Sequence, residues 1–285
     1  MATIRSVLHE ATDVLRRHGL PTPRLDAEVL LCRSLGTDRT HLYSHPEEIV
    51  GPDTLGRFRE WVERRRRQEP VAYIVGEKEF WSIPFAVDPR VLIPRADTEI
   101  LVEEALRVAQ ARDRILDVGT GSGAVAVALC RELPRAWIVA TDCSPEAATA
   151  AAGNAERAGV ADRVSIVVAD LLEPLCGPFD VIVSNPPYIP EDEFRELPPG
   201  VREYEPKEAL WAPGDGTAVH RRLIAGAPSV LKDGGWLLLE TGDRQAGEIA
   251  EALKDDGRYD RIGIRQDYGG RDRVVKARKM EIEHG

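Results

Sequence analysis

The sequence lacks a hydrophobic run that could cross a bilayer. No apolar stretch in the 285 residues approaches the roughly 18 that a spanning helix needs. The N-terminal segment carries Glu10 and Asp13 and contains no apolar, cleavable stretch, so we expect no secretory signal. These absences favour a cytoplasmic protein that does not associate with membranes.

Cysteine and histidine are scarce as well. The four cysteines, at positions 32, 130, 143 and 176, show no paired spacing, and the six histidines are scattered. A zinc site or a disulfide framework needs closely and regularly spaced residues of these types. We therefore predict no metal site and expect the cysteines to be reduced thiols.

Basic residues are outnumbered by acidic ones. The chain has 38 Lys and Arg against 48 Asp and Glu, which gives a net charge of −10. A free-standing nucleic-acid-binding protein is usually basic because phosphate contacts dominate its affinity, so we expect no stable nucleic-acid binding. The one basic run, Arg64 to Arg67, falls at the end of a predicted helix, where arginines suit the helix dipole. The alternative is a docking patch for an acidic partner or for RNA.

The spacing of the apolar residues, which make up 43% of the chain, divides it into three regions. In residues 1–70 they recur at helical intervals, which predicts a small helical bundle. Residues 71–92 contain short β-type runs, the first at 73–75 just before Gly76, and predict a β-hairpin linker between domains. Residues 93–285 form the third region and the second domain.

Strands and helices alternate in this third region. Strands are predicted at 115–118, 137–141, 164–168, 179–183 and 236–240, and helices at 98–111, from 123, at 145–158, 217–231 and 244–255. Two last strands, at 260–266 and 273–277, are close in sequence and predict an antiparallel hairpin at the sheet edge. The pattern indicates a Rossmann-like α/β domain with a mostly parallel seven-stranded sheet that helices cover on both faces.

A glycine-rich turn follows the first of these strands. Residues 115–123 read Ile-Leu-Asp-Val-Gly-Thr-Gly-Ser-Gly, and the glycines let the backbone bend sharply and let a ligand approach where a Cβ would collide. The second strand ends in Asp142, whose carboxylate can accept both hydroxyls of a ribose. The sequence therefore predicts a nucleotide-containing cofactor.

Two cofactors fit this pattern. With Ala124 the turn reads Gly-x-Gly-x-x-Ala, which is an allowed dinucleotide fingerprint and leaves an NAD-dependent dehydrogenase open. S-adenosylmethionine (AdoMet) fits because Asp117 precedes the glycines, where it could orient the turn or a water that faces an ammonium group. Asp170 and Leu171 end the third strand, where they could contact the adenine amino group and ring. A dehydrogenase does not need this series of acids and would lack a catalytic histidine or lysine in obvious position, so AdoMet is favoured.

The fourth strand ends in Asn185-Pro186-Pro187-Tyr188. The prolines end the strand, so an amide, free carbonyls and an aromatic ring lie at the carboxyl edge, where ligands bind in open α/β sheets. A planar amide or aromatic amine is a poor nucleophile because its nitrogen lone pair is delocalised. Asn185 Oδ1 and the Pro186 carbonyl could accept both N–H bonds of such a group, and Tyr188 could pack against it. An ordinary Pro-Pro turn that closes a strand is the plainer alternative.

These motifs, with five further segments, resemble the bacterial release factor glutamine methyltransferases. The segments are Pro-Arg-Leu-Asp-Ala-Glu at 23–28, Pro-Val-Ala-Tyr-Ile-Val-Gly at 70–76, Val-Leu-Ile-Pro-Arg at 91–95, Asp-Thr-Glu at 97–99 and Gly-Arg-Asp-Arg-Val-Val at 270–275. Members of this family are class I AdoMet-dependent methyltransferases. They methylate N5 of the glutamine in the Gly-Gly-Gln motif of class I peptide chain release factors, which modulates translation termination, and release S-adenosylhomocysteine.

The resemblance also implies roles for individual residues. It implies that AdoMet contacts Asp117, Gly119, Thr120, Gly121, Ser122, Gly123, Asp142, Asp170, Leu171 and Asn185. It implies that the glutamine lies against Asn185, Pro186, Pro187 and Tyr188, of which Asn185, Pro186 and Tyr188 would be catalytic. Arg95 and Glu99 would border the pocket. The helical bundle would recognise the release factor, and we expect a monomer.

Two departures from the family pattern concern the substrate. Ala96 stands where a proline is common after the arginine, and Leu-Trp-Ala-Pro-Gly-Asp-Gly-Thr at 210–217 replaces a stretch that usually has more glycine and a leucine after Asp-Gly. Because this loop follows the substrate strand, it bears on how the substrate fits.

Two other functions share some of these motifs. A nucleic-acid methyltransferase could use the same four residues on the N6 of a flipped adenine, but the acidic balance and the small helical domain disfavour it. A regulator that binds AdoMet without catalysis would not need the intact Asn-Pro-Pro-Tyr motif.

Overall fold

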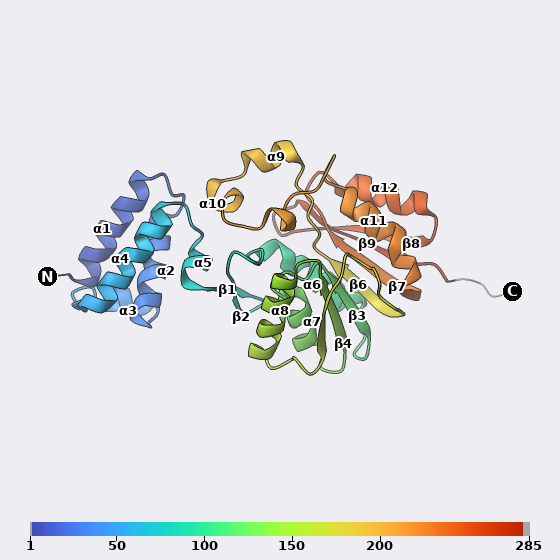
Figure 1. Cartoon of the computed structure of the whole chain (residues 1–285), viewed down its shortest axis with the longest axis horizontal. Coiled ribbons are helices and arrows are strands. Elements are labelled where there is room, and N and C mark those ends of the chain that lie inside the picture. Colours follow the sequence, from blue (N-terminus) through green and yellow to red (C-terminus); the bar gives the residue numbers. More distant parts are fainter. Residues whose placement is uncertain (1, 282–285) are drawn as a thin grey trace. The chain divides into compact units, whose positions relative to one another are not determined.

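The computed structural model describes residues 2–281, which divide into two compact units (Figure 1). The first unit extends through Glu77 and also contains the later segment Pro198–Tyr204. The second unit comprises Lys78–Leu197 and the chain from Glu205 onward. The chain therefore leaves the second unit after Leu197 and returns to it at Glu205.

The first unit is a small helical bundle, as the sequence predicts. Its helices are α1 (Ile4–Arg17), α2 (Pro23–Leu35), α3 (Arg39–Ser44), α4 (Pro52–Arg66), α5 (Val71–Val75) and α10 (Pro199–Arg202). Thr3 caps α1 through a reciprocal capping box with Ser6, which satisfies backbone N–H groups that the first turn leaves unpaired. The apolar stripe of α1 enters a core that it shares with α2 and with Phe58 of α4.

The prediction of a β-type run at 73–75 is wrong, because Val71–Val75 forms the short helix α5. Pro70 precedes this helix and Gly76 ends it in the left-handed conformation, with φ at +75°. Tyr73 and Ile74 are buried, so the packing of these side chains outweighs the preference of β-branched residues for strands.

The hairpin itself is present, and all of it after Glu77 belongs to the second unit. It consists of β1 (Glu77–Phe80) and β2 (Ile83–Ala86). Both residues between the two strands, Trp81 and Ser82, have positive φ, near +53° and +55°, as a two-residue type I′ turn requires.

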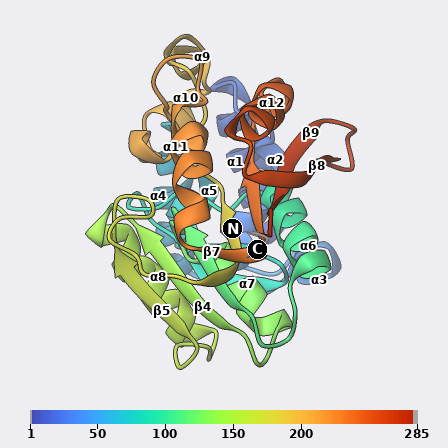
Figure 2. The ribbon, with the colours of Figure 1, turned by 90° about the vertical axis from the view of Figure 1, so that its right-hand side faces the viewer.

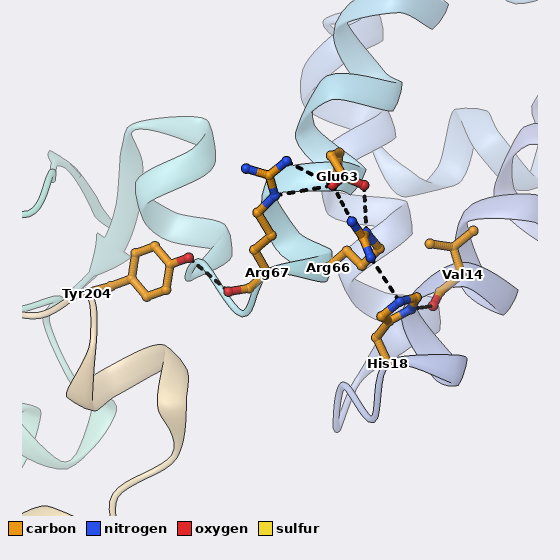
Figure 3. A network of polar contacts seen from close by, with 6 residues as sticks. All are labelled: Val14, His18, Glu63, Arg66, Arg67 and Tyr204. Carbon is orange, nitrogen blue, oxygen red and sulfur yellow. Dashed lines mark hydrogen bonds and ion pairs between the residues drawn. The ribbon is translucent and has the colours of Figure 1, made fainter.

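The arginine run at the end of α4 is paired inside the first unit. Arg65 is buried and donates to Asp26, at 2.7 Å from Nε to Oδ2. Arg64 pairs with Glu69. Arg66 and Arg67 both contact Glu63, and the Arg67 carbonyl accepts from Tyr204 at 2.8 Å (Figure 3). These contacts agree with a structural role for the run and leave little net positive charge there.

The segment 198–204 packs closely in the first unit. A Cβ added at Gly200 would lie 2.6 Å from the Gln68 carbonyl oxygen, so only glycine fits at this position. Together with the Tyr204 hydrogen bond, this contact holds the segment against the end of α4 (Figure 3).

The second unit contains the predicted seven-stranded sheet, in the order β5-β4-β3-β6-β7-β9-β8. The strands are β3 (Arg114–Val118), β4 (Trp137–Asp142), β5 (Val164–Val168), β6 (Phe179–Ser184), β7 (Leu231–Glu240), β8 (Tyr259–Gln266) and β9 (Asp272–Lys279). The first five of these pair in parallel, and β9 pairs antiparallel with both β7 and β8. The mostly parallel sheet with a terminal antiparallel hairpin is thus confirmed.

Helices cover the two faces of this sheet. Leu116 and Val118 belong to a core that also contains residues of α11 (Ala218–Gly226) and α12 (Ala246–Asp256). Because side chains alternate along a strand, Ile115 and Asp117 of β3 lie on the opposite face. That face carries α6 (Glu99–Val108), α7 (Ala124–Glu132) and α8 (Pro145–Arg157), which pack side by side. The two groups of helices are visible in Figure 2.

Two stretches of the second unit differ from the prediction. Helix α11 ends at Gly226 rather than near 231, because Pro228 follows, and β7 begins at Leu231 rather than at 236. After β6 the chain forms α9 (Glu191–Glu196) and the short 3₁₀-helix η2 (Lys207–Ala209), which the sequence analysis did not predict.

Candidate functional site

A cavity of about 610 Å³ opens at the carboxyl ends of the central parallel strands. All of its lining residues belong to the second unit. They include most of the residues singled out in the sequence, namely Asp117, Gly119, Thr120, Gly121, Ser122, Asp142, Asp170, Leu171, Asn185, Pro186 and Pro187. Segments from the ends of β3, β4 and β6 thus meet at one site.

The glycine-rich turn forms the floor of this cavity. The backbone N–H groups of Gly119 and Thr120 both donate to the Thr141 carbonyl, each at 2.8 Å. Gly119 and Gly121 have φ of +73° and +54°, and among the described residues no atom lies within 4 Å of where their Cβ would be. The turn therefore presents bare backbone to the cavity, as close approach of a ligand requires.

Gly123 makes the turn possible in a different way and does not line the cavity among the described residues. Its φ is +81°, and a Cβ there would lie 3.2 Å from the Ala151 Cα atom. This glycine lets α7 and α8 approach each other, and so it supports the turn from behind.

Asp142 is fixed by the turn that it faces. Its Oδ2 accepts from the Gly121 N–H at 2.9 Å, and its Oδ1 accepts from the Ser144 N–H at 3.0 Å. Each carboxylate oxygen can accept a second hydrogen bond. The carboxylate is therefore oriented in advance and can still bind the two hydroxyls of a ribose.

Asp117 is buried under the same turn, with 1% of its surface exposed. Its Oδ2 accepts from the Thr120 hydroxyl at 2.6 Å and from the Ala126 N–H at 3.2 Å. Burial raises the pKa of Asp117 to about 7, and the negative charge of Asp142 adds to the rise. Asp117 thus holds the turn on the first turn of α7 and would favour a cation in the cavity when ionised.

Asp170 and Leu171, which follow β5, also line the cavity. The Asp170 carboxylate pairs with Arg222 of α11 at 2.9 Å. A ligand N–H group that donates a hydrogen bond to Asp170 would therefore share this carboxylate with the Arg222 guanidinium. Leu171 has φ near +54°, which is uncommon for a residue with a Cβ. Such strained backbone often occurs at functional sites, and here it turns the chain along the cavity wall.

Asn185 lies at the cavity edge directly after β6. The preceding residue, Ser184, donates from its hydroxyl to the Val118 carbonyl at 2.7 Å, which ties the ends of β6 and β3 together. The Asn185 Nδ2 group donates to the Thr98 hydroxyl oxygen at 3.1 Å. Pro186 and Pro187 then lead the chain along the cavity wall.

Tyr188 does not line the cavity among the described residues. It is largely buried, which raises the pKa of its phenol, and the negative charge of Glu240 adds to the rise. Its backbone carbonyl accepts from Gln245 Nε2 at 2.9 Å. The ring is predicted to pack against a flat substrate group, and in the structure it lies near the buried Glu240.

The unusual loop at 210–217 packs on the Tyr188 backbone. Gly216 has φ of +85°, and a Cβ there would lie well under 3.0 Å from the Tyr188 carbonyl oxygen. Gln245 also donates to the Asp215 carbonyl at 3.1 Å, so one side chain holds both segments. The Asp215 carboxylate accepts from the N–H and the hydroxyl of Thr217, and these bonds lower the Asp215 pKa to about 2.

Sequence reasoning missed several polar residues of the site. Glu205 is buried and accepts from the Ile93 N–H at 3.2 Å and from Arg95 at 2.5 Å, so it orients an arginine that lines the cavity. Glu99, expected at the pocket border, is outside the lining among the described residues and accepts from the Trp81 N–H at 2.9 Å.

Thr98 and Glu240 were missed as well. Thr98 lines the cavity, and Glu240 is buried. The sequence did hold a signal for Glu240, which ends an apolar strand at the same carboxyl edge as Asp117 and Asn185.

Residues 2–281 contain neither a membrane-spanning helix nor a metal-binding cluster. In that part of the chain no helix is long and apolar enough to cross a membrane. The same residues contain no group of three or more His, Cys, Asp and Glu side chains arranged to hold a metal ion.

Family models match both units of the chain. Residues 6–76 match a model described as the PrmC N-terminal domain, and residues 96–196 match one described as the methyltransferase small domain. The two matched ranges contain helices α2 to α5 of the bundle, the glycine-rich turn and the Asn-Pro-Pro-Tyr segment.

Curated relatives match nearly the whole chain. A release factor glutamine methyltransferase of Geobacter sulfurreducens is 44% identical over 277 residues, which cover 97% of this chain and 96% of the relative. One of Vibrio cholerae is 44% identical, with 96% of each chain covered. A solved methyltransferase from Pyrococcus furiosus is 19% identical, covers 72% of this chain and 92% of that one, and superimposes with a TM-score of 0.54, which shows a shared fold.

Proposed function

We propose that this chain, which belongs to the release factor glutamine methyltransferase family, methylates the side-chain nitrogen of the glutamine in the Gly-Gly-Gln motif of class I peptide chain release factors. The methyl donor would be AdoMet, which the class I methyltransferase family uses. The observation that carries the proposal is that Asn185 borders the same cavity as the glycine-rich turn and Asp142.

The residues of the cavity fit AdoMet. The open space above Gly119 and Gly121 is a cradle that side chains would fill. Asp142 would bind the ribose hydroxyls, Asp170 and Leu171 would border the adenine, and Asp117 beneath the turn would favour the positive charge. When bound, AdoMet supplies an electrophilic methyl group on its sulfonium.

The chain's own task in such a transfer is to hold the glutamine nitrogen. Asn185 Oδ1 and the Pro186 carbonyl would accept its two N–H bonds, which orients the nitrogen lone pair toward the donor. Positioning of this kind is a large part of catalysis when two reactants must align in line. No titrating base is needed before the transfer, because the nitrogen can lose its proton afterwards.

The helical unit would bind the body of the release factor. The unit has a core of its own, and it includes the segment Pro198–Tyr204, which lies between two stretches of the second unit in the sequence. We expect the protein to act as a monomer in the cytoplasm, where release factors work, without stable binding to nucleic acid. If this unit recognises the factor, the intact factor should have a much lower KM than a short peptide that carries only Gly-Gly-Gln. Equal KM values would refute that role.

Transfer of a labelled methyl group from AdoMet to purified release factor tests the function. The control is the same factor with its Gly-Gly-Gln glutamine replaced. We expect label on the first protein and none on the second. Label on neither, with label on RNA or DNA from a cell extract, would favour adenine methylation instead.

A further inference from the structure

The orientation of the Asn185 amide decides whether its oxygen or its nitrogen faces the substrate glutamine. The oxygen and the nitrogen of an amide have nearly the same size, so the shape of the site cannot choose between two orientations related by a half turn. Only one of them presents the oxygen as an acceptor to the glutamine N–H. This question rests on the proposed function, because glutamine needs an acceptor at that place.

Thr98 is the partner that distinguishes the two orientations. The Asn185 Nδ2 group donates to Thr98 Oγ1 at 3.1 Å. Thr98 ends the 3₁₀-helix η1 (Ala96–Thr98) and is only 5% exposed, so water cannot readily replace this contact. A hydroxyl can both donate and accept, and the direction of its own proton therefore has to be set by another group.

That group is Glu240, at the end of the neighbouring strand. Ser184 of β6 pairs in register with Leu239 of β7, so the next residues along, Asn185 and Glu240, are neighbours at the carboxyl ends of the two strands. Glu240 is 1% exposed, and the side chains of Thr98 and Tyr188 lie near enough to its carboxyl to lower its pKa. Its Oε2 atom has no hydrogen-bond partner among residues 2–281.

The polarity of this chain of hydrogen bonds follows from the chemistry of its members. An ionised carboxylate only accepts, so beside Glu240 the Thr98 hydroxyl would give its single proton to the carboxylate and keep only lone pairs for Asn185. We propose that Glu240 and Thr98 are positioning residues that fix the amide of Asn185 with Nδ2 held inward and Oδ1 presented to the substrate nitrogen. Neither residue needs to touch the glutamine to do this.

Charged groups from several elements surround Glu240. Arg273 of β9 and Asp97 of η1 act on it electrostatically, Tyr188 lies beside it, and the His220 ring of α11 contacts its backbone carbonyl at 2.8 Å. Burial raises the Glu240 pKa to about 7, while hydrogen bonding and the charge of Arg273 oppose the rise. Below that pH the carboxyl gains a proton that it can donate to Thr98. Thr98 can then donate to Asn185 Oδ1, and the amide can turn over.

Substitutions at Thr98 separate this role from a merely structural one. Thr98→Val removes the hydroxyl and keeps the shape, whereas Thr98→Ser keeps the hydroxyl. We expect Thr98→Val to lower kcat about 10-fold, as the loss of one positioning hydrogen bond would. AdoMet affinity by calorimetry should change by less than about 2-fold, and Thr98→Ser should restore kcat. Thr12→Val, which removes a buried hydroxyl in α1, is the matched control and should leave kcat unchanged.

A double-mutant cycle tests whether Thr98 acts through Asn185. In the Asn185→Ala background, Thr98→Val should have no further effect on kcat, because there is no amide left to orient. The same 10-fold loss in both backgrounds would overturn the proposal. So would equal losses of kcat in Thr98→Val and Thr98→Ser.

A spectroscopic measurement on the substrate-free protein needs no release factor. The side-chain amide resonances of Asn185, identified by their loss in Asn185→Ala, should shift with pH around a midpoint near 7. The shift should vanish in Glu240→Gln and in Thr98→Val and persist in Thr98→Ser. A pH-independent Asn185 amide in the parent protein would refute the relay even if the factor is methylated. An absence of methyl transfer with the expected amide titration would refute the proposed function instead.

Discussion

Replacing Gly216 by alanine tests how closely the substrate loop controls the site. Gly216 has φ of +85°, and a Cβ there would meet the Tyr188 carbonyl oxygen and Gln245 Nε2 at well under 3.0 Å. Gly214, in the same loop, has φ of +68°, but no atom of the described residues lies within 4 Å of its Cβ position. The two substitutions therefore share a backbone cost and differ in the collision.

The magnitudes follow from this difference. A left-handed backbone costs an alanine about 1 kcal/mol, so Gly214→Ala should lose roughly that much free energy of unfolding. Gly216→Ala adds an overpacking cost of about 1–3 kcal/mol. Non-bonded atoms need roughly 3.5 Å, so the Tyr188 carbonyl must move by about 1 Å. A misplacement of that size at a site can lower turnover about 10²-fold.

The assay is steady-state methyl transfer to the release factor, with AdoMet affinity measured separately by calorimetry. We expect kcat to fall about 10²-fold in Gly216→Ala and less than about 3-fold in Gly214→Ala. AdoMet affinity should hold in both, since the loop does not include the glycine-rich turn. Equal kcat values in the two variants would refute the view that this loop positions the segment after Asn185.

Three further predictions concern separate parts of the molecule. Asn185→Ala should lower kcat roughly 10²-fold and largely keep the affinity for AdoMet, whereas Asp142→Ala should weaken AdoMet binding itself. Equal losses of AdoMet affinity in the two variants, measured by calorimetry, would contradict this division of roles. Arg65→Ala leaves a buried carboxylate unpaired and should cost about 3 kcal/mol in urea unfolding, while the exposed Arg67→Ala should cost under about 1 kcal/mol. The pKa of Asp117 is raised to about 7 in the folded state, so its contribution to the free energy of unfolding is lost as pH rises toward 7. Asp117→Asn should therefore raise the thermal unfolding midpoint of the AdoMet-free protein more at pH 8 than at pH 5. A difference that does not depend on pH would contradict the pKa shift.

Most of the sheet, and most of the turn that lines the cavity, can be predicted from the sequence. Runs of β-branched and other apolar residues mark the buried parallel strands, and the residues that end β3, β4 and β6 must meet because parallel strands share one carboxyl edge. For that reason the glycine-rich turn, Asp142 and Asn185 could be placed together before any coordinates were known.

The elements that could not be predicted from the sequence depend on tertiary contacts. The 73–75 run consists of an aromatic and two β-branched residues but is helical, because burial of its side chains decides its conformation. The segment 198–204 has no apolar period, and its place in the first unit rests on single contacts such as that of Gly200 with Gln68. Tyr188 lies near Glu240 and does not line the cavity among the described residues, which no spacing of residues reveals.

The most direct test of the central claim locates the methyl group on the substrate. Release factor would be incubated with the protein and AdoMet, digested, and its Gly-Gly-Gln peptide fragmented in a mass spectrometer. The account predicts the mass of one added methyl group on the glutamine side chain, and a roughly 10²-fold slower addition when Asn185→Ala replaces the parent protein. A methyl group on another residue, or an unmodified factor beside methylated adenine in nucleic acid, would contradict the account.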